Sequence, residues 1–226
     1  MRYILYLSCL LFAIAGCSTI KAKENHPLLN CFFSTELSKN DTLVLYAEQE
    51  EWDSSKVKEL QDTFLLRYLS QPLFDQLNFT GQGRYFAAQR FLLDEKTEAC
   101  VVYTLDVWFK MTSLLLWNRQ TKEVYGVVPG LAQYYGGESG QIYNYSWLFL
   151  HKNTPHIYTK TLEHWWLLPT DDQEEATEKN SEENEFKQWN ILKFDSIAMA
   201  DSSRTALFFR NKLKDVAPFS LDTIGQ

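Results

Sequence analysis

The sequence has few of the patterns that identify an enzyme, a metal protein or a nucleic-acid-binding protein. Its 22 lysines and arginines are outnumbered by 29 aspartates and glutamates and form no basic face, so nucleic acid is not an expected partner. The zinc-protease pattern H-E-x-x-H and the calcium-loop pattern D-x-[DN]-x-[DN]-G are both absent. Ser139 follows a glycine as in the hydrolase pattern G-x-S-x-G, but Gln141 stands where the last glycine should be. These absences favour a non-catalytic protein without a cofactor.

The hydrophobic run near the amino terminus is too short for a membrane span. It extends from Tyr3 to Ala15, whereas a transmembrane helix takes roughly 20 apolar residues. Arg2 precedes the run, and small residues end it just before Cys17, which is the pattern of a secretory signal peptide. We therefore predict that residues 1–16 are a signal that is removed on export.

The end of this signal, Ile14-Ala15-Gly16-Cys17, resembles the lipobox of bacterial lipoproteins. The resemblance covers the signal and the first mature residue only. It implies that Cys17 receives a diacylglyceryl group on sulfur, becomes the first residue after cleavage, and is often acylated again on its new amine. Such chains anchor a protein stably, since each buried methylene contributes about 0.8 kcal/mol. Ser18, not an aspartate, follows the cysteine, and the sorting rule of such lipoproteins then favours the outer over the inner membrane of the cell envelope.

The rest of the chain has the composition of a folded protein. Residues 17–28 are mostly polar after the cysteine and predict a short lipidated tether. The whole sequence is 45% hydrophobic and 15% aromatic, which is enough for a substantial core. We predict one globular domain over residues 29–226.

Negative charge is concentrated in one segment of that domain. Residues 171–185 hold eight acidic residues against Lys179, so this segment alone carries a net charge of 8 − 1 = 7 negative charges. Because the segment is poor in apolar residues, we predict a mobile, solvated acidic loop over residues 170–185. Calcium binding there is the alternative, although the spacing of a known calcium loop is absent.

Apolar and aromatic segments predict an α+β fold built on an antiparallel meander of about six to eight strands. Short polar turns, such as residues 94–97 and 118–121, part most of these segments, and hairpins imply antiparallel pairing. Alternation is clear where Val101 and Tyr103 would face one side of the sheet and Val102 the other. The predicted strands span residues 42–48, 84–93, 98–109, 112–118, 122–128, 143–151, 156–167 and 186–198.

One helix is predicted before the meander and a C-terminal helix after it, both packed on the sheet. Residues 53–55 would cap the first helix, and apolar residues at helical spacing follow as far as Leu69. Pro72 would then break or kink this helix. Residues 201–203 would cap the last helix, which would run to about Lys214.

Two cysteines remain once Cys9 leaves with the signal and Cys17 carries lipid. In an exported protein, Cys31 and Cys100 form either a disulfide or two buried free thiols, and the sequence leaves both readings open. A bridge would close a loop of about 70 residues and stabilise the fold by ~4 kcal/mol.

Three histidines are weak candidates for a metal site. His151 and His156 flank the predicted turn at residues 152–155 and would face each other on a hairpin, and His164 follows beside Glu163. Imidazoles can bind zinc, and a nearby carboxylate can act as a base in a hydrolase. The alternative is a set of ordinary histidines near a turn. Since their spacing matches no known metal motif, we expect no metal here.

Aromatic side chains are the better candidates for binding a partner. Four tyrosines lie in or beside a glycine-rich segment predicted to be a flexible loop, where tyrosine offers a large contact area at little entropic cost. Trp165 and Trp166 are adjacent, so on a strand they would point to opposite faces and at least one could be exposed. The alternative is that all these rings cover the sheet. The tyrosines are Tyr134, Tyr135, Tyr143 and Tyr145.

These features together predict a membrane-anchored envelope lipoprotein without catalytic activity. It would bind a protein or glycan partner, or play a structural part at the membrane surface. One alternative is an envelope hydrolase, with or without metal, that uses His151, His156 or His164. Another is a sheet that binds a lipid or small ligand in a cavity between sheet and helix.

Overall fold

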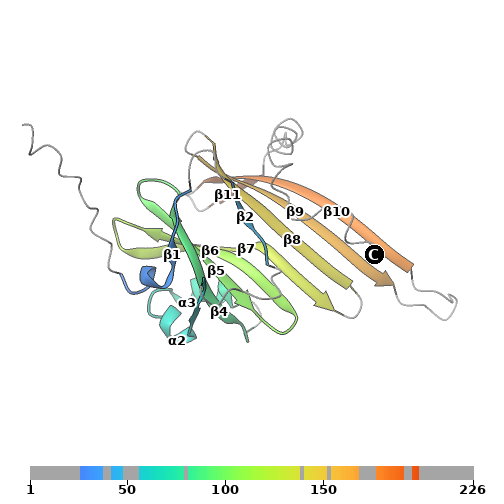
Figure 1. Cartoon of the computed structure of the whole chain (residues 1–226), viewed down its shortest axis with the longest axis horizontal. Coiled ribbons are helices and arrows are strands. Elements are labelled where there is room, and N and C mark those ends of the chain that lie inside the picture. The colour runs from blue at the N-terminus through green and yellow to red at the C-terminus, as the bar shows by residue number, and fades with distance from the viewer. Residues whose placement is uncertain are drawn as a thin grey trace, which may run out of the picture.

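One curled sheet of 11 strands contains most of the regular structure (Figure 1). The computed structural model describes residues 26–37, 42–47, 56–78, 81–137, 140–151, 154–167, 177–190 and 195–198. Within these ranges the elements are η1 (Leu29–Cys31), β1 (Phe33–Ser34), β2 (Thr42–Leu45), β3 (Lys58–Leu60), α2 (Asp62–Leu65), α3 (Gln71–Leu77), β4 (Arg84–Leu92), β5 (Thr97–Leu105), β6 (Phe109–Asn118), β7 (Glu123–Gly137), β8 (Gly140–His151), β9 (Thr154–Leu167), β10 (Thr177–Asn190) and β11 (Asp195–Ala198).

The predicted meander is present, but it is not the whole sheet. Strands β4 to β11 follow one another in chain order, and each pairs antiparallel with the next. Three short amino-terminal strands then join the sheet out of sequence. β1 pairs with β4 in parallel, β3 pairs with β4 antiparallel, and β2 pairs with β8. The broad α+β prediction holds, although the sheet is mixed and dominates the few short helices.

A bulge in β7 makes room for β2. The β6–β7 register shifts between Thr112 and Leu114, and Gly130 within this bulge has φ +66°, a conformation that glycine adopts without strain. Strand β7 pairs with β8 only as far as Asn144, and β2 takes the neighbouring position from Ser146 onward. The strand predicted over residues 42–48 is confirmed for its first four residues, Thr42–Leu45.

The single long helix predicted before the meander is wrong. Residues 58–60 form β3 instead, because Leu60 is buried in the core where it pairs with Tyr85 of β4. Two short helices, α2 and α3, follow. The helical segment is interrupted before Pro72, as predicted, and Pro72 lies in the first turn of α3, where its missing N–H costs nothing. The proposed cap at residues 53–55 and the predicted C-terminal helix lie outside the described residues.

The acidic loop prediction is also wrong wherever the structure describes that segment. Residues 177–185 belong to β10, whose pairing with β9 runs without interruption from Thr177 opposite Leu167 to Gln188 opposite His156. The apolar content of the segment is low, but the long β9 strand offers it a complete set of backbone hydrogen-bonding groups. Pairing with a neighbour thus overrides a composition that favours a loop.

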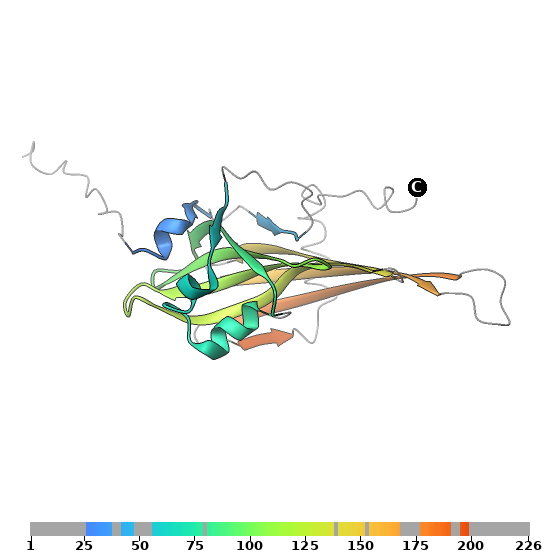
Figure 2. The same ribbon diagram turned by 90° about the horizontal axis from the view of Figure 1, so that it is seen from below.

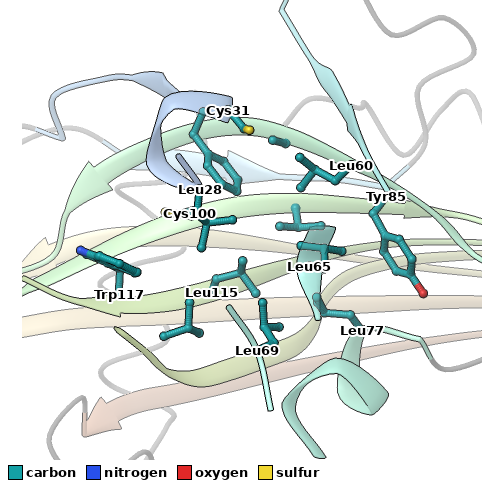
Figure 3. Packing of buried hydrophobic residues seen from close by; sticks show 14 of the residues in the cluster. Leu28, Cys31, Leu60, Leu65, Leu69, Leu77, Tyr85, Cys100, Leu115 and Trp117 are labelled. Carbon is teal, nitrogen blue, oxygen red and sulfur yellow. The ribbon is translucent and has the colours of Figure 1, made fainter. Parts of the chain in front are cut away.

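Both faces of the central strands are covered (Figure 2). On one face, Cys100, Val102 and Leu115 pack against η1, α2 and α3 (Figure 3). On the other face, Ala99 and Val101 pack in a second cluster that includes Leu45 of β2. The predicted alternation of Val101 and Val102 between two faces is confirmed, and β5 is buried because each face meets another layer.

An ion pair is buried between β4 and β5. The Arg90 side chain is 10% exposed and that of Glu98 is 6% exposed, and Nη1 of the arginine lies 2.5 Å from Oε1 of the glutamate. By contrast, the pair between Arg84 and Glu59 lies on the surface. Only the Arg90–Glu98 pair is shielded from water. Losing one partner is therefore more costly to stability in this pair than in the surface pair.

Candidate functional site

The β5–β6 turn presents the most exposed large apolar side chains of the described residues. The N–H of Asp106 donates to the carbonyl of Phe109 at 2.8 Å, and the Asp106 carboxylate accepts from the N–H of Val107 at 2.5 Å. This tight turn leaves Val107 80% exposed and Trp108 63% exposed. The N–H of Gly136 donates to the Trp108 carbonyl at 3.3 Å, which holds the turn beside the end of β7.

The neighbouring strands continue this apolar surface. Register places Phe109 of β6 beside Tyr135 of β7, and Tyr135 beside Ile142 of β8, so the three residues share one face of the sheet. Tyr135 is 39% exposed. We call Val107, Trp108, Phe109, Tyr135 and Ile142 the aromatic tip.

The candidate tyrosines lie in strands rather than in a flexible loop. In the sequence Tyr134-Tyr135-Gly136-Gly137, a methyl group at Gly136 would collide with the Tyr134 hydroxyl, and one at Gly137 would lie 2.7 Å from the Tyr135 hydroxyl. Each ring therefore lies over the glycine two positions ahead, on opposite faces of β7. Glycines are needed here for this close approach. The prediction of a flexible loop is wrong for these residues, although residues 138–139 lie outside the described part.

The other face of this end of the sheet carries a second aromatic row. Tyr134 pairs with Tyr143 across β7 and β8, with ring centroids 5.1 Å apart, and the Lys110 ammonium lies 5.4 Å from the centre of the Tyr134 ring. Further along β8, Tyr145 contacts Trp147 edge to face at 4.9 Å. Tyr134, Tyr143 and Tyr145 are all half-buried. Each of these rings contacts another side chain of the sheet, so part of each ring covers the sheet.

Both tryptophans lie in β9. Register pairs Trp165 with Gly140 and Trp166 with Glu178 of β10. The Trp165 ring lies so close over Gly140 that a methyl group there would collide with it, and its Nε1 donates to the Glu163 carboxylate at 3.3 Å. Trp165 is thus half-buried on its own sheet. The side chain of Trp166 lies outside the description.

The three candidate histidines do not converge. Register pairs His151 with Thr154 and His156 with Phe149, so the two histidines near this hairpin are not opposite each other. The His156 ring is buried and stacks on Phe149 with centroids 5.7 Å apart. His164 lies eight positions further along β9, a separation of about 26 Å in an extended strand. Across the described ranges, no three histidine, cysteine, aspartate or glutamate side chains gather as metal ligands do.

Cys31 and Cys100 are free thiols in the structure, and both are buried in the same core cluster (Figure 3). The Cys31 thiol donates to the Pro27 carbonyl at 3.4 Å. Burial raises the pKa of the Cys100 thiol well above its ordinary value, and the nearby Glu98 carboxylate raises it further, whereas Arg90 opposes both. Of the two states that the sequence left open, the structure has the pair of buried thiols.

The aromatic tip lies at the end of β6 away from the amino terminus of the described chain. His26, the first described residue, packs on Trp117 with ring centroids 4.3 Å apart, and burial lowers its pKa. Trp117 is near the end of β6 and Phe109 is at its start, so about 26 Å of extended strand separates them. Cys17 lies outside the described residues. No helix within those residues is long and apolar enough to pass through a bilayer.

Sequence reasoning missed Val107 and Trp108 as candidates because both were assigned to a strand over residues 98–109. The signal that could have found them is Asp106, because aspartate often begins a turn. The two large apolar residues that follow it would then lie in the turn and not in a buried strand. Comparisons with protein-family models, with curated proteins and with solved structures find no match to this chain.

Proposed function

We propose that this chain is a lipid-anchored envelope protein without catalytic activity that binds a protein partner through its aromatic tip. The lipid anchor rests on the lipobox-like sequence at Ile14-Ala15-Gly16-Cys17. The binding role rests on one observation, the exposure of Val107 and Trp108 at a hydrogen-bonded turn. Exposed aliphatic and tryptophan side chains have no stabilising role in water, and tryptophan and tyrosine are enriched in protein interfaces.

The position of the tip supports this proposal. The tether enters the fold near His26, at the Trp117 end of β6, and the tip lies about 26 Å away along that strand. A protein held to the membrane at one end would present the other end to partners in the envelope. Val107 favours a protein over a glycan, because an aliphatic side chain has no ring face on which a sugar can stack.

A glycan partner is the second candidate, and Tyr135 favours it. The outer half of its ring lies over Gly137, which holds the ring against the sheet while 39% of the residue stays exposed. A ring held in this way loses little conformational entropy when another flat surface stacks on it.

Site-specific photocrosslinking in the native host tests the proposal. A photoreactive amino acid at position 107 of the full-length chain should give one discrete crosslinked protein, whereas the same group at Leu66, which is also an exposed apolar residue, should not. Trp108→Ala should remove the product from position 107, and Leu92→Ala should leave it. Identical products from positions 66 and 107 would overturn the binding role. A product that disappears on treatment with glycan hydrolases would favour the glycan.

A further inference from the structure

A pocket of about 660 Å³ lies where two short strands meet one edge of β4. β1 pairs with Gln89 and Arg90, and β3 pairs with the stretch that ends at Ala87. The β4–β5 register shifts between Ala87 and Arg90, at the junction of the two short strands. Thr35 follows β1 and donates two hydrogen bonds to the Arg90 carbonyl, one from its N–H and one from its hydroxyl. These bonds fix the position of the chain that leaves β1. The volume lies within the roughly 300–1,000 Å³ typical of small-ligand pockets.

The lining combines apolar walls with two cations. Apolar side chains come from η1 and the start of β1, and no aspartate or glutamate lines the pocket. Of the two cationic residues, Lys58 is exposed and Arg90 is buried. The lining residues are Leu29, Asn30, Cys31, Phe32, Phe33, Ser34, Lys58 and Arg90.

Arg90 retains hydrogen-bonding capacity beyond its ion pair. Its Nη1 donates to Glu98, while its Nε is buried and has no acceptor among the described residues. A guanidinium has five N–H donors, and a buried donor without an acceptor is costly. Glu98 balances one of the two cations, and the described residues form no ion pair with Lys58, in a chain whose net charge is −7.

We propose that this pocket binds a small amphiphilic anion, namely a carboxylate or phosphate attached to a short apolar body. The head group would be held by Lys58 and Arg90, and the apolar body would lie against Leu29, Phe32 and Phe33. Such a ligand matches both parts of the lining, whereas a neutral apolar molecule would offer no counter-charge to Lys58 and no acceptor to the Arg90 Nε. This site is separate from the aromatic tip and does not depend on it.

Calorimetric titration with octanoate and octyl phosphate tests the proposal, with 1-octanol as the neutral control of equal chain length. The protein is the mature chain carrying Cys17→Ser, so that detergent is not needed. We expect one saturable site for at least one of the two anions, and the tighter one identifies the head group. Equal binding of 1-octanol, equal binding of inorganic phosphate and octyl phosphate, or no saturable binding of either anion would overturn the proposal.

Two surface variants make the test specific to this pocket. Lys58→Glu should weaken binding at least tenfold, and Ser34→Trp, which blocks the pocket without changing charge, should weaken it similarly. Lys96→Glu, a matched charge reversal in the β4–β5 turn, should bind as the parent does. All three positions are exposed, so the fold should be retained, and circular dichroism checks this. Unchanged affinity in Lys58→Glu and Ser34→Trp would contradict the assignment of the site.

Discussion

At the residue scale, Arg90 and Glu98 show why burial decides the value of a charged pair. Both side chains are almost fully removed from water and lie in contact, 2.5 Å apart. Removing either one leaves the other as an isolated buried charge, which is far more costly than losing a surface pair. The sequence shows neither the burial nor the pairing. It has 22 basic and 29 acidic residues, and nothing in it sets Arg90 and Glu98 apart from the rest.

We therefore predict that Glu98→Ala lowers the free energy of unfolding by about 3–5 kcal/mol, because Arg90 remains buried without its counter-ion. Urea unfolding monitored by tryptophan fluorescence measures the change. Glu59→Ala, which breaks the exposed pair with Arg84, serves as the control and should leave the unfolding midpoint nearly unchanged. Equal effects from the two variants would show that the Arg90–Glu98 pair is not buried in solution.

The raised pKa of the Cys100 thiol predicts a loss of stability at alkaline pH. Its folded pKa lies above the ordinary value of 9.0, so above that pH the unfolded thiol ionises while the folded one stays protonated. The unfolded state then binds fewer protons, and the free energy of unfolding must fall as pH rises. Tyr103, whose pKa burial raises to about 12, extends this loss above the ordinary tyrosine value of 10.0.

Urea unfolding at a series of pH values between about 8 and 10 checks this prediction. Cys100→Ala should flatten the decline in that range, since the titrating group is gone. Val102→Ala, a truncation on the same face of β5, should lower stability by a constant amount and keep the slope. Parallel curves for Cys100→Ala and the parent would argue against a protonated, buried thiol.

At the element scale, β10 shows where local composition misleads. Its sequence is acidic and poor in apolar residues, yet 12 consecutive residues pair with β9. Strand formation here depends on β9, whose edge supplies hydrogen-bonding partners over a sufficient length. Both β9 and β10 have 14 residues. An acidic strand is also a poor template for unwanted pairing, because like charges on two copies repel.

Hydrogen exchange followed by mass spectrometry tests the strand assignment of β10. Peptides that cover residues 177–188 should exchange more slowly than a peptide that covers the turn at residues 94–97, because amides in a ladder are protected from water. The β8 strand provides an internal reference for a strand paired on both sides. If residues 177–188 exchanged as fast as the turn, the strand assignment would be contradicted and the solvated loop that the composition suggests would be supported.

At the scale of the whole molecule, the sheet separates the first described residues from the aromatic tip. His26 packs on Trp117 near one end of β6, and the aromatic tip lies at the other end of that strand. If the proposed lipid at Cys17 holds the first end to the membrane, the tip is the part most available to a partner. The anion pocket lies beside η1, close to the entry of the tether.

The anchor itself is predicted from Cys17 and has a direct test. Cys17→Ser should abolish both the incorporation of labelled palmitate and the cleavage before residue 17, because the thioether to the diacylglyceryl group cannot form. Cys9→Ser, within the predicted signal, should leave both properties unchanged. An unmodified Cys17 thiol in the mass spectrum of native protein would contradict the lipoprotein assignment.

The sequence by itself determined the elements that depend on local pattern. Apart from the second half of β7 and the first residues of β8, the strands from β4 to β9 follow from runs of branched and aromatic residues parted by short polar turns. Val101 and Val102 face opposite sides because successive strand residues must. Only the tertiary structure decided what depends on a distant partner. Residues 58–60 became a strand because β4 had a free edge, and the acidic segment became β10 because β9 was there to pair with it. Val107 and Trp108 are exposed because the strand ends at Leu105, where Asp106 favours a turn and the pairing of β5 with β6 fixes it.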